Sequence, residues 1–93
     1  MEKIRSETLW FAYILRSAVD GKRYVGLSDN VERRVAEHNA GHTQSTKSRR
    51  PLELLYKEAF PSRREARVRE KYFKTAAGRR FLDRMLKKIP LHP

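Results

Sequence analysis

The fold is decided by residues 10–26, which read WFAYILRSAVDGKRYVG. The stretch from Trp10 to Leu15 is entirely apolar or aromatic, which is typical of a strand buried on both faces at the centre of a sheet. The pair Asp20-Gly21 is a turn signal, and residues 22–26 then return as a second strand pattern. We therefore expect a hairpin whose tip is formed by residues 18–21.

A first helix is predicted after the hairpin, over about residues 30–40. Asp29 followed three residues later by Glu32 is a capping box, and Gly41 stands where a left-handed helix terminus would fall. Residues 41–51 are polar and basic, with no apolar side chain to anchor them. We therefore expect this segment to be a mobile surface loop.

A third strand and two further helices complete the predicted order. Residues 52–60 have the two-residue alternation of a strand with one wetter face. The apolar members of this alternation are Leu52, Leu54, Tyr56 and Phe60. Ser62, with a glutamate three residues later, opens a helix that we expect to run to about Ala76 and to be broken by Gly78, before a last amphipathic helix that ends ahead of Pro90. The sequence predicts an α+β fold of order β-β-α-β-α-α.

Length and composition narrow the class of protein. The chain has 93 residues, enough for a single domain spanning residues 1–93, and its 22 Lys and Arg against 11 Asp and Glu leave a net charge of +11. This excess of positive charge favours nucleic acid as the partner. The absence of cysteine excludes disulfides and thiolate zinc sites. No stretch approaches the roughly 20 apolar residues of a membrane span, and residues 9–15 lack a signal-peptide cleavage site, so we expect a cytoplasmic protein without a membrane partner.

A set of polar residues occupies positions that otherwise have the pattern of a core. These residues are Tyr13, Tyr24, Arg34, His38 and Glu70. An ionised side chain taken out of water is costly unless it is paired, ligated or wetted, so several such residues in one small domain indicate a site. Together they fit phosphodiester hydrolysis, which needs a carboxylate for Mg²⁺, a guanidinium for the phosphate, and a phenol or imidazole for the proton of the attacking water.

Each of these residues also has a structural interpretation. Tyr13 and Tyr24 could be core tyrosines with satisfied hydroxyls. Glu70 could be a solvated helix residue paired with Lys74 one turn later.

Arg34 and His38 could likewise form a surface pair beside Glu37. His38 and His42 have the spacing of zinc ligands, but Gly41 interrupts the helix between them and the sequence offers no third ligand. We therefore do not expect a zinc site at this pair.

The order and spacing of the motifs resemble the GIY-YIG endonuclease superfamily, and within it the small stand-alone bacterial proteins. The first motif is Phe11-Ala12-Tyr13 and the second is Tyr24-Val25-Gly26, with 11 residues from one tyrosine to the other. The segment 45–51 is similar to the loop of the stand-alone group. The resemblance covers a core of about residues 9–82 and implies a three-stranded antiparallel sheet flanked by helices.

The resemblance also implies roles for the candidate residues. Arg34 and His38 match the arginine and histidine of the family's first helix, and Glu70 matches its metal-binding glutamate. The implied activity is that of a Mg²⁺-dependent endonuclease, in which Mn²⁺ or another divalent cation could substitute. Glu70 and the scissile phosphate would hold the cation, Arg34 would neutralise transition-state charge, and Tyr13 or Tyr24, assisted by His38, would activate water.

Two departures from the family pattern support an alternative. Phe11 and Ala12 replace the glycine and isoleucine of the first motif, and no asparagine follows the glutamate, since the asparagines are Asn30 and Asn39. A non-catalytic nucleic-acid-binding protein that retains the nuclease fold is the alternative to the enzyme. A structural basic protein that coats a polyanion is a third, weaker one.

The basic side chains predict how nucleic acid would be held. The candidates for contact are Lys47, Arg49, Arg50, Arg63, Arg67, Lys71 and Lys74. Such residues track the phosphate backbone and read few bases, so we expect cleavage to be structure-selective, with DNA favoured over RNA as the substrate. The basic residues from Arg63 to Lys74, which fall in the predicted second helix, could also form only a solvated helix face. The sequence leaves the oligomeric state open.

Overall fold

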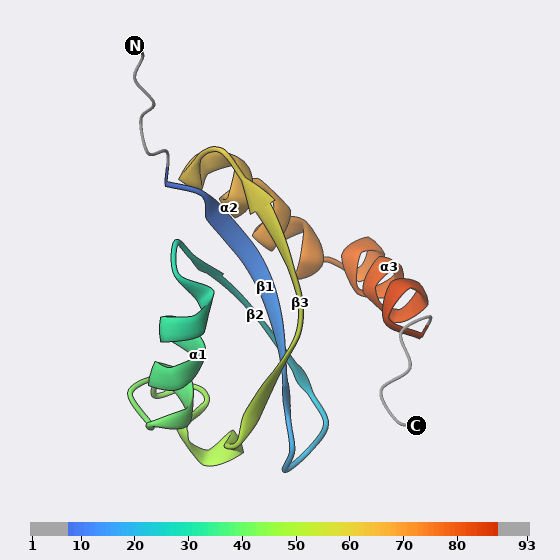
Figure 1. The fold of residues 1–93 in the computed structure, drawn as a ribbon. Helices are drawn as coiled ribbons and strands as arrows, with labels where there is room; N and C mark the ends of the chain where they lie inside the picture. The colour runs from blue at the N-terminus through green and yellow to red at the C-terminus, as the bar shows by residue number, and fades with distance from the viewer. Residues whose placement is uncertain (1–7, 88–93) are drawn as a thin grey trace.

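The computed structural model describes residues 8–87 and contains three strands and three α-helices. The elements are β1 (Trp10–Ser17), β2 (Arg23–Ser28), α1 (Val31–Asn39), the short 3₁₀ helix η1 (Lys47–Arg49), β3 (Leu52–Phe60), α2 (Arg63–Phe73) and α3 (Ala76–Lys87). Figure 1 shows their arrangement. The order β-β-α-β-α-α and the α+β class are as predicted.

The central position of β1 organises the sheet. Both neighbours run antiparallel to it, and the strand order is β2-β1-β3. Ala12, Ile14 and Leu15 have no exposed surface, which is what a strand covered on both faces requires. The prediction that the apolar run from Trp10 forms the middle strand is confirmed.

Alternate residues of β1 face two separate apolar layers. Ala12 and Ile14 pack against Phe73 of α2 and, beyond it, against α3. Tyr13 points the other way, into a layer closed by Val31 of α1. Helix α1 therefore covers one face of the sheet, and α2 and α3 cover the other.

An irregularity in β3 alters the predicted alternation. The register with β1 shifts so that Ile14 pairs with Tyr56 but Leu15 pairs with Leu54, which leaves Leu55 as an extra residue in β3. Such a β-bulge reverses the side-chain alternation beyond it. Leu52 consequently packs on the α1 face, whereas Tyr56 packs on the α2 face. The expectation that these residues share one face was wrong.

The N-terminal end of α1 is capped by the residue next to the predicted one, whereas the C-terminal end is as predicted. Asn30, and not Asp29, caps the helix, because the Asn30 side-chain oxygen accepts a hydrogen bond from the Arg33 backbone N at 3.0 Å. Gly41 has a φ of +86°, and its backbone N donates to the His38 carbonyl at 3.1 Å. The predicted left-handed terminus at Gly41 is confirmed.

The boundary between α2 and α3 lies earlier than predicted. Ser62 caps α2 as expected, accepting from the Glu65 backbone N at 3.2 Å. The helix ends at Phe73 rather than near Ala76, because the Thr75 hydroxyl accepts from the Gly78 backbone N at 3.0 Å and so starts a new helix.

Gly78 does not break a helix but lies buried in the first turn of α3. A side chain at this position would run into the Tyr72 carbonyl group, so glycine lets α3 turn closely against the end of α2. Even α3, the longest helix at 12 residues, is too short to cross a membrane, and no helix within residues 8–87 has the length and apolar character to do so.

Residues 41–51 are tied to the rest of the fold, contrary to the expectation of an unanchored loop. Asn39, at the end of α1, donates to the Leu52 carbonyl at 3.0 Å and accepts from the Leu52 N at 2.7 Å, which clamps the two ends of the segment together. Ser17 Oγ donates to the Arg49 carbonyl at 2.7 Å. Thr46 is fully buried. Hydrogen bonds thus supply the anchorage that apolar side chains do not.

Candidate active site

Tyr13 lies on the α1 face of β1, with its ring across the neighbouring strand at Gly26. The two residues are register partners. A Cβ atom on residue 26 would lie 2.8 Å from Tyr13 Cε1 and closer still to Cζ and the hydroxyl oxygen, so only glycine leaves room for the ring. Glycine at position 26 therefore permits the close approach of the Tyr13 ring.

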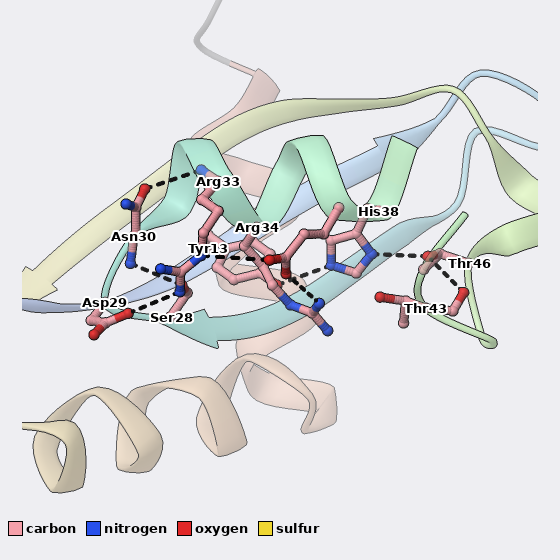
Figure 2. A network of polar contacts seen from close by, with 10 residues as sticks. Tyr13, Ser28, Asp29, Asn30, Arg33, Arg34, His38, Thr43 and Thr46 are labelled. Atoms are coloured by element: carbon pink, nitrogen blue, oxygen red, sulfur yellow. Dashed lines mark hydrogen bonds and ion pairs between the residues drawn. The ribbon is translucent and has the colours of Figure 1, made fainter. Parts of the chain in front are cut away.

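His38 is the partner of the Tyr13 hydroxyl, and it has no exposed surface. Its Nε2 lies 3.1 Å from Tyr13 Oη, and its Nδ1 lies 2.8 Å from Thr46 Oγ1. Figure 2 shows the imidazole between the two hydroxyls, below α1. The alternative interpretation of His38 as half of a surface pair is therefore wrong. His42, which has the spacing of a zinc partner for His38, is exposed, and no zinc site was expected at this pair.

The hydrogen bonds of Thr46 show which of the two His38 nitrogens donates and which accepts. Thr46 Oγ1 also lies within 3.5 Å of the Thr43 carbonyl, which can only accept. Thr46 therefore donates to Thr43 and accepts from His38 Nδ1–H, which leaves Nε2 free to accept the Tyr13 hydroxyl proton. Burial first, and then the Arg34 charge, lower the pKa of His38, against an opposing effect of Glu37. The imidazole is thus held neutral.

Tyr24 closes the aromatic cluster from β2. Its ring centroid lies 4.9 Å from that of His38 and 6.4 Å from that of Tyr13. Both contacts have tilted or edge-on geometry, which aromatic pairs favour. The two phenols therefore lie in one cluster, and Tyr13 is the one that bonds to His38.

Arg34 brings a permanent positive charge to the Tyr13 hydroxyl. Its Nη1 pairs with Glu37 Oε1 at 3.0 Å, and its side chain is about one-third exposed. Burial opposes the charge, yet hydrogen bonding to Glu37 and the nearby phenols raise the pKa of Arg34 above its usual value. The guanidinium acts on both Tyr13 and Tyr24. It therefore faces the site while remaining within reach of a solvent-borne anion.

The Tyr13 phenol is hard to ionise in this setting. Burial first, and then the nearby Tyr24, raise the pKa of Tyr13 to about 12, while Arg34 lowers it and Glu70 raises it. Desolvation disfavours the charged form of any acid. Tyr13 is consequently a protonated donor at neutral pH, and it acts as a base only if its own proton leaves as it takes another.

Glu70 approaches the same phenol from α2, across the sheet from α1. Its charge acts on Tyr13, and its side chain is 14% exposed. The Glu70 Oε2 atom pairs with Lys74 Nζ at 3.0 Å. The helical pair considered as an alternative does form, but it forms at the rim of the Tyr13 site rather than on an open helix face.

The donor set fits magnesium better than zinc. Within residues 8–87, no three His, Asp or Glu side chains gather as a metal-binding group. Mg²⁺ commonly uses one or two carboxylates and completes its octahedron with water and substrate phosphate oxygens. Glu70, a largely buried carboxylate whose partner is the half-exposed Lys74, is suited to such a site.

The predicted basic residues of α2 lie beside Glu70. Arg63, Arg67, Glu70 and Lys74 have the spacing of one helical stripe, and Lys71 lies next to it. All of the basic members are exposed. The stripe therefore runs along the rim of the site, where phosphates of a bound strand could lie.

The basic residues of the loop are more engaged with the protein. Arg50 Nε donates to the Lys47 carbonyl at 2.7 Å. Arg49 is half-buried, with its Nε 3.5 Å from Asp20 Oδ2 at the hairpin tip. Lys47 is exposed. Arg49 and Arg50 thus help to hold the loop, in addition to any contact with a ligand.

Sequence reasoning missed Thr46, which completes the His38 chain. A single threonine in a polar loop carries no sequence signal, because its contact with His38 depends on how the loop folds back under α1. Asn39 was also missed as a clamp. Its place at the end of a helix whose following loop must return to the sheet was a weak signal.

Comparison with known proteins extends over most of the chain. The sequence profile of the GIY-YIG catalytic domain matches residues 9–82. The UPF0213 protein of Desulfotalea psychrophila is 46% identical over 63 residues, which are 66% of this chain and 56% of that protein. The UPF0213 protein of Bacillus pumilus is 41% identical over 66 residues, which are 70% of this chain and 66% of that protein. The matches thus span less than two thirds of the length of these relatives.

A solved structure is similar as well. The solution NMR structure of the UPF0213 protein BH0048 from Bacillus halodurans aligns with a TM-score of 0.53 at 33% sequence identity, covering 88% of each chain. The arrangement of strands and helices described above is therefore shared with an experimental structure of a relative.

Proposed function

This chain belongs to the GIY-YIG family, and from that premise we propose that it is a divalent-cation-dependent endonuclease that hydrolyses phosphodiester bonds in nucleic acid. The observation that carries the proposal is the surroundings of the Tyr13 hydroxyl. A neutral imidazole accepts from it, and a guanidinium and a carboxylate both act on it. These are the groups that hydrolysis of a phosphate ester requires.

The geometry supports Tyr13, rather than Tyr24, as the group that activates water. As the water oxygen attacks phosphorus, Tyr13 Oη takes the water proton and passes its own proton to His38 Nε2, 3.1 Å away. His38 then carries protons on both nitrogens, with Nδ1–H still donating to Thr46. The bond from phosphorus to the leaving oxygen breaks, and that oxygen takes a proton from solvent.

Glu70 and Arg34 handle the charge of the phosphate. Glu70, together with the scissile phosphate, would hold the divalent cation, which supplies Lewis-acid stabilisation of the phosphate oxygens and of the hydroxide that forms. Arg34 lies beside Tyr13 with its guanidinium partly exposed, so it can donate two hydrogen bonds to a phosphate as charge develops. The raised pKa of Tyr13 makes this positive charge necessary.

The substrate is proposed to be DNA, recognised by its structure more than by its sequence. The α2 stripe offers exposed guanidinium and ammonium groups, which neutralise phosphates without reading bases. Each α-helix described within residues 8–87 contributes buried side chains to one of the two apolar layers, so none of them forms a separate base-reading element.

A binding protein without activity is the second candidate, favoured by the changes in the first motif. In the structure, however, Phe11 lies in the α1-face layer with Lys57 Nζ 5.0 Å from its ring centroid, and Ala12 is buried on the other face. Both changed positions are packing positions. The chemical groups of the site therefore stay in place, which supports the enzyme over the binding protein.

The test is cleavage of end-labelled branched, flapped and linear DNA, and of RNA, with Mg²⁺ or Mn²⁺ and with EDTA. Glu70→Ala should lower the rate at least about a hundredfold, because the cation loses its protein ligand. Glu32→Ala, which removes an exposed carboxylate from the first turn of α1, is the matched control and should cleave normally.

The result also separates the two candidates. Metal-dependent cleavage that is lost in Glu70→Ala and kept in Glu32→Ala supports the endonuclease. Binding that is unaffected by EDTA or by Glu70→Ala, without cleavage of any of these substrates, would overturn the endonuclease in favour of the binding protein.

A further inference from the structure

A hollow of about 490 Å³ lies beside the candidate site, between β2 and the junction of α2 with α3. Its basic lining residues are Lys22 and Arg23 from β2 and the turn before it, Lys74 from the end of α2, and Arg79 from α3. Tyr24 forms part of its wall. We call this hollow the β2–α3 groove.

Three of the four cations in the β2–α3 groove can face a ligand. Arg23 is engaged with α3, since its Nη2 lies 2.8 Å from Asp83 Oδ1 and 3.5 Å from the Arg79 carbonyl. Lys22 and Arg79 are exposed, and Lys74 is held by a single ion pair. The groove therefore has four cations, and two carboxylates, Asp83 and Glu70, pair with two of them, which leaves an excess of positive charge suited to a polyanion.

Two of the residues that line the groove also contact residues of the candidate active site. Tyr24 of β2 is one of the residues that line the groove, and its ring packs on the α1 face, 4.9 Å from the His38 ring. Lys74, on its rim, is the ion-pair partner of Glu70. A strand whose scissile phosphate lies at Tyr13 could thus continue directly into the groove.

We propose that the β2–α3 groove binds the sugar-phosphate backbone next to the scissile phosphate, and that a backbone phosphate there draws Lys74 away from Glu70. The proposal rests on the proposed function and names residues that its chemistry does not use. The nucleic acid would thereby free the carboxylate that the divalent cation needs, so that substrate binding prepares the cation site.

The unequal burial of the pair explains how Lys74 can exchange partners. The Lys74 side chain is 54% exposed, whereas that of Glu70 is 14% exposed. An ion pair one helical turn apart and open to water is weak. A phosphate in the groove can therefore compete with Glu70 for the Lys74 ammonium group, while the Glu70 carboxylate stays in place.

The groove is tested by affinity for a fluorescent DNA oligonucleotide in EDTA, measured by anisotropy at several salt concentrations. The double variant Lys22→Ala/Arg79→Ala should bind about tenfold more weakly and reduce the slope of log K against log salt by about 1 to 2. The control Arg64→Ala/Arg84→Ala removes the same charge from exposed positions that do not line the groove. Equal losses in the two double variants would overturn the groove.

The exchange at Lys74 is tested by Mn²⁺ binding without nucleic acid, followed by the EPR signal of the free ion. Lys74→Met should bind Mn²⁺ about fivefold or more tightly than Lys71→Met, which removes the same charge from the same helix. Equal affinities in the two variants would show that Lys74 does not compete for Glu70.

Neither measurement depends on cleavage, so the two proposals fail separately. If the protein cleaves DNA but the Lys22→Ala/Arg79→Ala variant binds DNA like its control, the endonuclease proposal stands and the groove proposal is wrong. If the protein cleaves none of the substrates but shows the predicted differences in affinity, the groove proposal stands and the endonuclease proposal is wrong.

Discussion

Two tyrosines on opposite faces of the sheet show what distinguishes the α1 side from the α2 side. Tyr13 lies on the α1 face, and Tyr56, which pairs with the next residue of β1, lies on the α2 face. Burial is the first cause that raises the pKa of each to about 12. Each also forms a hydrogen bond, and the difference lies in the acceptor.

Tyr13 donates to a neutral imidazole, whereas Tyr56 donates to the Glu58 carboxylate. Burial acts against ionisation of Glu58, but hydrogen bonds from Arg69 and Tyr56 lower its pKa. Arg69 binds both Glu58 oxygens, at 2.8 and 3.3 Å. Glu58 is therefore an anion at neutral pH and a poor proton acceptor, whereas the neutral His38 can accept a proton. The same side chain is structural on one face and suited to proton transfer on the other.

Removal of the two hydroxyls, one at a time, should give the largest difference between the two tyrosines. Tyr13→Phe should lower the cleavage rate by about 10² to 10⁴, the usual contribution of a general base, because the path to His38 is lost. Tyr56→Phe should leave the rate within about twofold. The measurement is single-turnover cleavage, and circular dichroism confirms that both variants are folded. Equal rates in the two variants would show that the α1-face phenol has no special role.

The close approach that places Tyr13 can be broken at Gly26. Gly26→Ala should destabilise the protein by about 3 kcal/mol, because its Cβ would overlap the Tyr13 ring that His38 and the sheet hold in place. Gly21→Ala, at a φ of +71° with nothing within 4 Å of the added atom, should cost only about 1 kcal/mol from backbone strain. Urea unfolding measures both. A Gly26→Ala variant no less stable than Gly21→Ala would contradict the packing of the ring.

The dependence of stability on alkaline pH should also distinguish the two phenols. The pKa of Tyr13 is raised from 10.0 to about 12 on folding, so its contribution to stability is complete below pH 10 and is lost as the pH rises toward 12. Two pKa units correspond to about 2 to 3 kcal/mol. The fall in the free energy of unfolding between pH 9 and about pH 11.5 should be smaller in Tyr13→Phe than in the wild type. Tyr56 is less buried, so Tyr56→Phe should flatten the curve less.

The sequence predicted elements whose signals are local. The apolar run from Trp10, the cap at Ser62 and the glycine at 41 each act within a few residues, and each performs its predicted part. The order of the motifs predicted that Arg34 and Glu70 belong with Tyr13, and the charges of both residues act on the Tyr13 hydroxyl.

The features that were not predicted depend on contacts between distant segments. The bulge at Leu55 depends on register with β1, which alternation within β3 does not reveal. Thr75 starts α3 although Lys74 and Ala76 are good helix formers, because α3 must turn to cover the sheet. The burial of His38 could not be read from α1 alone, since its second partner, Thr46, comes from the loop.

The smallest expected effect concerns the far end of the His38 chain. Thr46→Val should cost about 1 to 2 kcal/mol of stability, because it leaves the buried Nδ1–H of His38 without an acceptor. Thr43→Val is the matched control: the Thr43 hydroxyl is buried without a hydrogen-bond partner, so its replacement by a methyl group should be neutral or stabilising. Urea unfolding compares the two, and the NMR shift of His38 Nδ1–H reports the loss of its partner. If Thr46→Val were as harmless as Thr43→Val, the hydrogen bond between His38 and Thr46 would not contribute to stability. The assignment of Nε2 as the acceptor of the Tyr13 proton would then lose its support.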